Sequence, residues 1–503
     1  MVPPTEGRML VLYFFNASNE AIETLVQLDE AVSRSPAALT LLAISRENPD
    51  KLRNLMENIG GMNKPGSAVL IDDKGITTAY GLARRLPAAI IVGPGNTVVS
   101  ILSPVQGARE IVLASADTFV SMRLPIAALS IYNAMPDDWL SEPEKTVAVG
   151  YASVMAGNAP AVRADLERLA GSSSPLSSEA HAALGFLLFR EGSGDKALAE
   201  CSRASGSGFA DYVAGMVWAG RGECAKASNL FNKAAKGTFA FEWQKAVAFN
   251  MAARIAESKR NESAAQEWYK KGFSVAPLNT AINANLLCHH WQNGNIPAAV
   301  AYAEVISSAS AGDPIATALV NEFKIENEFV KDARAQKEFE EKLDRESAQR
   351  AAHKGRRTAS PYKVLVADLV VTDGIPELNC LPLAGAALLK YNLEKESGGT
   401  LLAIRRPEMT EAVKRLNITG DMSASPANLQ KVARFLSADM LMFGEISPYE
   451  GEYLLNLRIG DVSSGEIVAV VSERVAFLDD LPNAIRKSAK ALTEKMKSHP
   501  AGR

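Results

Sequence analysis

Alanine-rich helical segments that come in pairs occupy residues 123–312, and this pattern limits the possible folds more than any other feature of the chain. The pairs are 144–156 with 159–169, 178–190 with 195–204, 209–219 with 224–235, 241–256 with 262–273, and 280–292 with 296–308. Several of the turns between paired helices carry glycine, as in Gly220-Arg221-Gly222. Because each hairpin can bury its apolar face only by stacking on the next, the pattern predicts an all-α helical-repeat array.

The segments on either side of the array mix strand and helix patterns. Residues 9–15 form an apolar strand that leads through a short polar turn into a helix, and residues 85–99 predict a hairpin around a Gly-Pro-Gly-Asn turn. Strands and helices return after residue 361. We therefore predict a multidomain chain with domains at 1–122 (α/β), 123–312 (all-α array), 313–361 (charged helix and linker) and 362–503 (α/β).

The first domain carries a family resemblance. Tyr80-Gly81-Leu82, then Leu86-Pro87, then the apolar run 90–92 and a glycine-containing turn resemble the second half of a TlpA-like thioredoxin fold. The resemblance implies a cis Pro87 and places Asn19 and Ile22 where the family has its two cysteines. Since a thiolate is the nucleophile of that chemistry, we expect a redox-inactive domain in which Asn19 serves as a helix N-cap.

The helical array also resembles a known repeat. Residues 222–227 and 269–277 are similar to tetratricopeptide repeats, although the period departs from 34 residues. Such arrays present a concave surface to a protein partner or a neighbouring domain. Helical spacing predicts that the four tryptophans of the array, at 218, 243, 268 and 291, lie mostly in the core between repeats.

Two cysteines lie in the second helices of consecutive hairpins. Cys201 and Cys224 are expected to be buried small residues, and an oxidising compartment would allow a disulfide between them. His289 and His290 are adjacent, so their side chains diverge on a helix and predict no metal site. We find no pattern for a cofactor, a metal or a catalytic group.

The last domain resembles a family of envelope proteins. Segments 364–369, 437–445 and 457–469 are similar to the curli-secretion channel protein, the N-terminal domain of TolB and the penicillin-binding-protein activator lipoproteins. These relatives bind other proteins, and the resemblance implies an interaction module of the bacterial cell envelope. Asp461 and Gly465 fit the chemistry of a turn between two strands.

Composition excludes several other classes. The net charge of −3 gives no basic field for nucleic acid, and no apolar run is long enough to span a bilayer. The first residues lack a signal-peptide pattern, so we expect a periplasmic protein if an export signal has been removed and a cytoplasmic one otherwise.

These patterns favour a non-catalytic scaffold or adaptor. It would dock other envelope proteins through the array surface and the last domain, in an assembly for secretion, motility or wall synthesis; its oligomeric state stays open. One alternative is a thiol-redox factor that uses Cys201 with Cys224. Another is a sensor of peptides or small ligands in the groove between Asn19 and Pro87.

Overall fold

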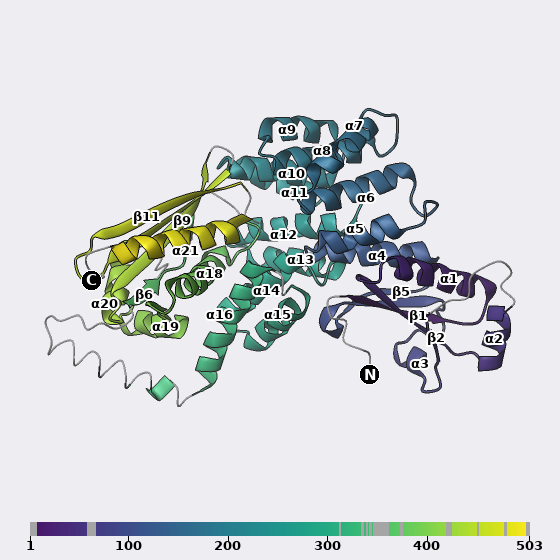
Figure 1. Cartoon of the computed structure of the whole chain (residues 1–503), viewed down its shortest axis with the longest axis horizontal. Helices are drawn as coiled ribbons and strands as arrows, with labels where there is room; N and C mark the ends of the chain where they lie inside the picture. Colours follow the sequence, from purple (N-terminus) through teal and green to yellow (C-terminus); the bar gives the residue numbers. More distant parts are fainter. Residues whose placement is uncertain are drawn as a thin grey trace. The chain divides into compact units, whose positions relative to one another are not determined.

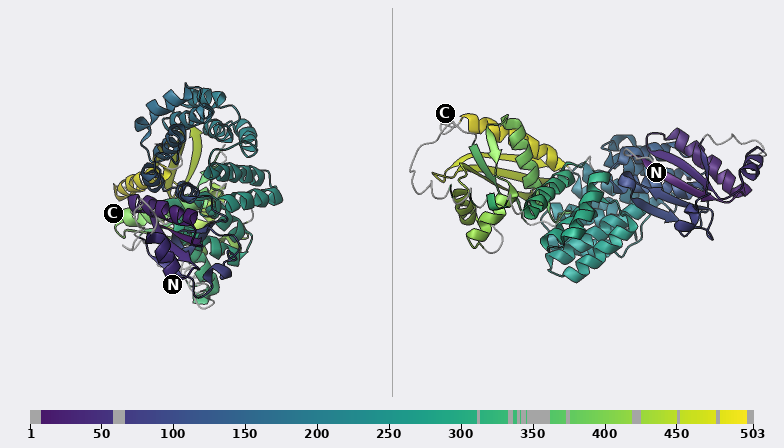
Figure 2. Two further views of the ribbon diagram at one scale, coloured as in Figure 1. Left: turned by 90° about the vertical axis from the view of Figure 1, so that its right-hand side faces the viewer. Right: turned by 90° about the horizontal axis from the view of Figure 1, so that it is seen from below.

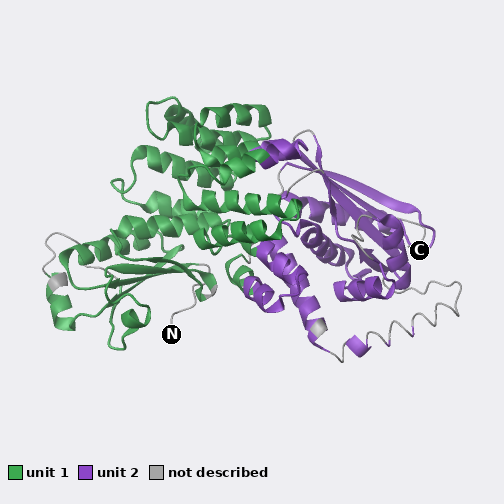
Figure 3. Ribbon diagram, turned by 180° about the vertical axis from the view of Figure 1, so that it is seen from behind, with its two compact units in different colours: residues 1–214, 229–283, 304–310 green, residues 215–228, 284–303, 311–503 purple. Residues whose placement is uncertain are grey.

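The structure is a computed structural model in which the chain forms two compact units (Figure 3). The first unit holds residues 1–214, 229–283 and 304–310, and the second holds 215–228, 284–303 and 311–503. The array is thus shared between the units, and the predicted boundaries at 122, 312 and 361 stay predictions. The structure describes residues 8–57, 67–310, 313–332, 336–338, 341, 345, 362–372, 376–418, 425–449, 452–476 and 480–498.

The first unit begins with a mixed five-stranded sheet of order β3-β2-β1-β4-β5. Strands β1, β2 and β3 are parallel, whereas β4 runs antiparallel to β1 and β5 antiparallel to β4. The elements of this part are β1 (Met9–Phe15), α1 (Asn19–Arg34), β2 (Leu39–Ser45), α2 (Pro49–Glu57), β3 (Val69–Ile71), α3 (Ile76–Ala79), β4 (Ala88–Val92), η1 (Pro94–Asn96), β5 (Val98–Leu102) and α4 (Ala108–Ser121).

Strand β1 lies in the middle of this sheet and is fully buried. All seven of its residues are buried, as expected for a strand with parallel and antiparallel neighbours and covered faces. Alternate residues Leu10, Leu12 and Phe14 join one apolar cluster with Ile90 of the neighbouring strand. Helices α1 and α4 pack against each other, and α4 also packs on β4 and β5.

Helical hairpins follow the sheet, and the teal helices stack as antiparallel pairs (Figures 1 and 2). They are α5 (Pro125–Ala134), α6 (Glu142–Met155), η2 (Ala159–Ala161), α7 (Arg163–Ala170), α8 (Ser177–Arg190), α9 (Gly194–Arg203), α10 (Gly208–Gly220), α11 (Cys224–Ala234), α12 (Glu242–Ser258), α13 (Glu262–Val275), α14 (Thr280–Gln292) and α15 (Ile296–Ala309). A helical array with two mixed α/β sheets is the fold class that the sequence predicted.

The tryptophans of the array only partly follow the prediction. Trp243 is buried, whereas the other three are half-buried. Trp218 lies under the ammonium of Lys226, and Trp268 lies under that of Lys271, at 4.2 and 4.3 Å from the ring centres. A long cationic side chain covers each of these two half-buried rings, an arrangement that helical spacing alone does not reveal.

The second unit contains a mixed sheet of order β11-β10-β9-β6-β8, with the short β7 paired to β9. Strand β6 is parallel to β8 and β9, while β9, β10 and β11 form an antiparallel meander. Its elements are α16 (Pro314–Lys331), β6 (Tyr362–Val366), β7 (Val370–Val371), α18 (Leu381–Ser397), β8 (Leu401–Ala403), α19 (Arg406–Arg415), α20 (Pro426–Phe435), β9 (Met440–Tyr449), β10 (Glu452–Asp461), β11 (Ile467–Val475) and α21 (Leu481–Ser498).

The turn between β10 and β11 has the predicted chemistry. The Asp461 carboxylate accepts the backbone N–H groups of Ser463 and Ser464, each at 2.8 Å. Gly465 has a φ of 76°, a left-handed conformation that glycine adopts without strain. These residues therefore shape the hairpin.

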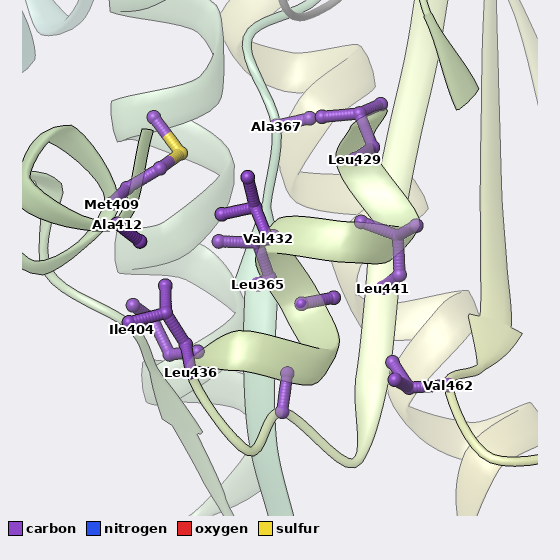
Figure 4. Close-up of a cluster of buried hydrophobic side chains, with 12 residues drawn as sticks. Leu365, Ala367, Ile404, Met409, Ala412, Leu429, Val432, Leu436, Leu441 and Val462 are labelled. Carbon is purple, nitrogen blue, oxygen red and sulfur yellow. The ribbon is translucent and has the colours of Figure 1, made fainter. Parts of the chain in front are cut away.

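One face of this sheet is closed by α19 and α20 over an apolar core (Figure 4). Leu365 of β6 and Leu441 of β9 meet Leu429 and Val432 of α20, while Met409 comes from α19. These elements are far apart in the sequence, so the core joins the two helices to the strands. Helix α21 covers β10 and β11.

Helix α16 opens the segment predicted to be a linker, but it packs against α18 and α19. Arg406 donates from both Nη atoms to the Asp368 carboxylate, at 2.7 and 3.0 Å, and its Nε lies 3.8 Å from Glu326 of α16. Lys390 of α18 pairs with Glu322 of α16. These ion pairs are largely buried, and separating their partners would leave uncompensated charges. They therefore hold α16 against the last domain. The part of the predicted charged helix and linker after residue 345 lies outside the described residues.

Candidate functional site

The start of α1 is the place where the resemblance locates a redox site. Ser18, not Asn19, is the helix N-cap: it has an extended backbone, and its hydroxyl accepts the N–H of Ala21 at 3.2 Å. The prediction that Asn19 caps the helix is therefore wrong by one residue. Asn19 is the first helical residue and is exposed, whereas Ile22 is completely buried.

Pro87 lies at the same end of the sheet. Phe14 of β1 pairs with Ala88 of β4, so the register carries Pro87 toward the end of β1 from which the chain enters α1. The peptide bond between Leu86 and Pro87 is cis, as the resemblance implied, and a second cis bond at Ser103-Pro104 was not expected. Neither an amide nor an aliphatic side chain can act as the nucleophile of thiol exchange.

Cys201 of the array is a poor candidate for thiol exchange. No disulfide joins Cys201 to Cys224 in the part of the chain that the structure describes, so that pairing stays a prediction. Cys201 packs against Gly185, where an added Cβ would lie 2.6 Å from its sulfur. Burial raises the pKa of the Cys201 thiol to about 12, which leaves little thiolate at neutral pH.

A buried carboxylate organises the inside of the array. Glu179 of α8 accepts hydrogen bonds from the Tyr151 hydroxyl at 2.6 Å, from the Gln244 side chain at 2.9 Å and from the Ser207 hydroxyl at 3.3 Å. The Tyr151 ring lies edge-on to Phe209, with 5.0 Å between ring centres. Each polar group is satisfied inside an aromatic cluster, so this network links successive hairpins and offers no free group to a ligand.

A cavity of about 280 Å³ lies beside α4 within the first unit. Arg109, Leu113 and Asp117 line it from α4 at spacings of four residues, which places them on one stripe of the helix. At 1.5 Å per residue, this stripe is roughly 12 Å long. The other lining residues come from α6 and from the residues just before α6, α8 and α12: Glu144, Val147, Ala148, Leu140, Leu176, Ala240 and Phe241.

The two ends of the cavity differ in charge. At one end Arg109 donates from Nη2 to Glu144 at 3.0 Å and from Nε to the carbonyl of Trp139, so this cation is already paired. At the other end Asp117 accepts the Tyr132 hydroxyl at 3.2 Å. No lysine or arginine pairs with Asp117 among the described residues.

The surroundings of Asp117 raise the pKa of its carboxyl. Burial raises the pKa of its carboxyl to about 7, the negative charge of Glu242 adds to the rise, and the hydrogen bonds from Tyr132 and the Glu242 backbone oppose it. Burial also raises the pKa of Tyr132 well above its usual value, so that phenol stays a donor. A cation that entered the cavity would meet this carboxylate without competition from a cation of the described chain.

Sequence reasoning missed this cavity. The stripe Arg109, Leu113, Asp117 is visible in the sequence, but such spacing is equally typical of any half-exposed helix. The start of α12 closes the cavity from more than a hundred residues away, and no local pattern indicates that proximity. Among the described residues, no group of acidic, histidine or cysteine side chains could hold a metal ion, and no described helix is long and apolar enough to cross a membrane.

Comparison with known proteins found partial likenesses. No protein-family model matches the chain, and no curated protein matches it. The C-terminal domain of LpoB from Salmonella enterica is similar at 14% identity and a TM-score of 0.19, over 25% of this chain and 90% of that domain. A single-substitution variant of the PelC dodecamer from Paraburkholderia phytofirmans is similar at 16% identity and a TM-score of 0.18, over 28% of this chain and 94% of that one.

Proposed function

We propose that this protein is a non-catalytic adaptor that docks other proteins of a bacterial envelope assembly. The observation that carries the proposal is the cavity beside α4, which ends at a carboxylate that no cation of the described chain neutralises. A cavity of about 280 Å³ lies at the lower edge of the range typical of small-molecule sites, so it suits a side chain of a partner better than a cofactor.

The start of α1 supports the non-catalytic part of the proposal. Ser18 caps the helix, Ile22 is buried beneath it, and the exposed Asn19 carries an amide in place of a thiol. In our interpretation a thioredoxin-like domain has kept its fold as a rigid block next to the array. The assignment to the envelope rests on the sequence resemblance of segments 364–369, 437–445 and 457–469.

Quantitative affinity capture from an envelope extract of the native host tests the adaptor function. We expect the wild type to retain a reproducible set of proteins. Ala148→Leu, which places a larger side chain in the cavity, should retain them at least about fivefold less, equivalent to about 1 kcal/mol. Lys270→Glu, an exposed change on α13 away from the cavity, is the matched control and should bind as the wild type does. No stable partner for the wild type, or equal capture by both variants, would contradict the proposal.

An insulin-reduction assay tests the redox alternative. The Cys201 thiol is buried, and Asn19 and Ile22 stand where the resemblance places the two cysteines. We therefore expect no activity above background. Reduction of insulin that disappears in Cys201→Ser would favour the redox factor over the adaptor.

A further inference from the structure

The cavity beside α4 has an apolar middle between its two charged ends. Leu113 lies between Arg109 and Asp117 on the α4 stripe, and the apolar side chains of Leu140, Val147 and Leu176 also line the cavity; Leu140 and Val147 are buried. Of the three charged residues that line the cavity, Arg109 and Glu144 pair with each other, and Asp117 at the far end has no ion-pair partner among the described residues. An occupant that matches both features has an apolar stem and a terminal cation.

The hydrogen bonds of Asp117 favour an ammonium over a guanidinium. Tyr132 already donates to Oδ1, and the backbone N–H of Glu242 also donates to the carboxylate. A bidentate arginine fork needs both carboxylate oxygens to be available as acceptors in the carboxylate plane, whereas a lysine ammonium is a compact point charge that can approach a single oxygen. Lysine also carries four methylenes that can lie along the apolar middle.

We propose that the cavity beside α4 binds a lysine side chain of a partner protein, with the ammonium on Asp117 and the methylene stem along Leu113 and Val147. This inference rests on the proposed adaptor function and specifies the chemistry of the partner at that site. The surrounding charged groups agree with it. Tyr132 of α5 is a neutral donor. Glu242 of α12 adds negative potential, although its side chain is paired with Lys245 of the same helix, and Arg109 lies about two helical turns away in its pair with Glu144.

Methyl NMR of the full-length protein tests this inference. The protein is labelled at leucine and valine methyl groups and titrated with Nα-acetyl-lysine-N-methylamide as the probe. We expect saturable shifts of the methyls of Leu113, Val147 and Leu176, with a Kd on the order of 1–10 mM, since one side chain contributes only a few kcal/mol. The norleucine analogue, which has a comparable stem without the ammonium, and the arginine analogue should each bind at least about fivefold more weakly.

Two further readouts depend on Asp117. Asp117→Asn should weaken the lysine probe at least about fivefold, whereas Asp137→Asn, a change at a side chain that is 97% exposed, should leave the affinity unchanged. Because the pKa of Asp117 is about 7, its ionised fraction rises about tenfold between pH 6 and pH 8, and the affinity should rise with it.

Three results would overturn the inference: no methyl shifts, equal shifts with the norleucine analogue, or unchanged affinity in Asp117→Asn. These results are distinct from failure of the adaptor function. If Ala148→Leu still weakens protein capture while the lysine probe does not bind, the cavity docks a partner through other chemistry and only the lysine is refuted. If capture also fails to depend on Ala148, the adaptor function at this cavity is refuted.

Discussion

Asp117→Asn should change how the stability of the first unit depends on pH. The pKa of this carboxyl is about 7 in the folded chain, against 3.8 for an unperturbed aspartate, because burial removes water that would stabilise the charged form. The folded state therefore holds the proton more tightly than the unfolded state. The stability associated with the protonated form is complete below about pH 4 and is lost as the pH rises toward and through 7.

The size of the effect follows from those two values. Linkage between pKa 3.8 and about 7 lowers the free energy of unfolding by at most roughly 2.5 kcal/mol between pH 5 and pH 8. Asp117 is partly exposed toward the cavity, so water reduces the effect, and we expect roughly 1–2.5 kcal/mol. The asparagine of the variant has no proton to lose, so the variant should gain stability relative to the wild type by this amount over the same pH interval.

Hydrogen exchange with mass spectrometry at increasing urea concentration is a suitable assay. It reports the opening of α4, α5 and α6 separately from the second unit, which matters because a chain with two units need not unfold in one step. Asp137→Asn is the control and should follow the wild type at both pH values. A stability difference between wild type and Asp117→Asn that stays constant within about 0.5 kcal/mol from pH 5 to pH 8 would refute the reasoning.

Three further predictions concern other parts of the chain. Asn19→Cys with Ile22→Cys should form a disulfide on oxidation, detected as protection from alkylation; thiols that never pair would show that the alignment with the thioredoxin positions is wrong. Arg406→Met should destabilise the second unit by roughly 2–4 kcal/mol in urea unfolding, because two carboxylates lose their cation, and Arg406→Lys should recover only part of this; a loss under about 1 kcal/mol would contradict it. Native alkylation at pH 8 should modify Cys224 before the buried Cys201, and equal rates would contradict the account of Cys201.

The architecture was accessible from the sequence because it depends on local patterns. The run 9–15 is apolar throughout and became the fully buried β1, and the glycine-containing turns of the array separate helices close to the predicted ones. The error at Asn19 has a local cause as well, since Ser18 and Asn19 are both good capping residues and only the backbone conformation decides between them.

The candidate site was less accessible because it depends on distant segments. The pKa of Asp117 is raised only because Tyr132 of α5 and the start of α12 at Glu242 pack around its carboxyl. The ion pairs of Arg406 likewise join α16 to α19 across some eighty residues, and a charged helix gives no sign of that packing. The charge and helical spacing of such residues are the same whether they face solvent or form these contacts, so the sequence pattern does not distinguish the two cases.

Site-specific photo-crosslinking from the rim of the cavity tests the central claim most directly. A photoreactive phenylalanine derivative replaces Ala240, an exposed residue of the cavity lining, or Lys270 as the control on α13. The account predicts that, in the envelope extract, position 240 gives a discrete crosslinked partner that an excess of unlabelled wild-type protein displaces, and that position 270 does not. Crosslinks of equal yield at both positions, or none at position 240, would contradict the claim that this cavity docks a protein.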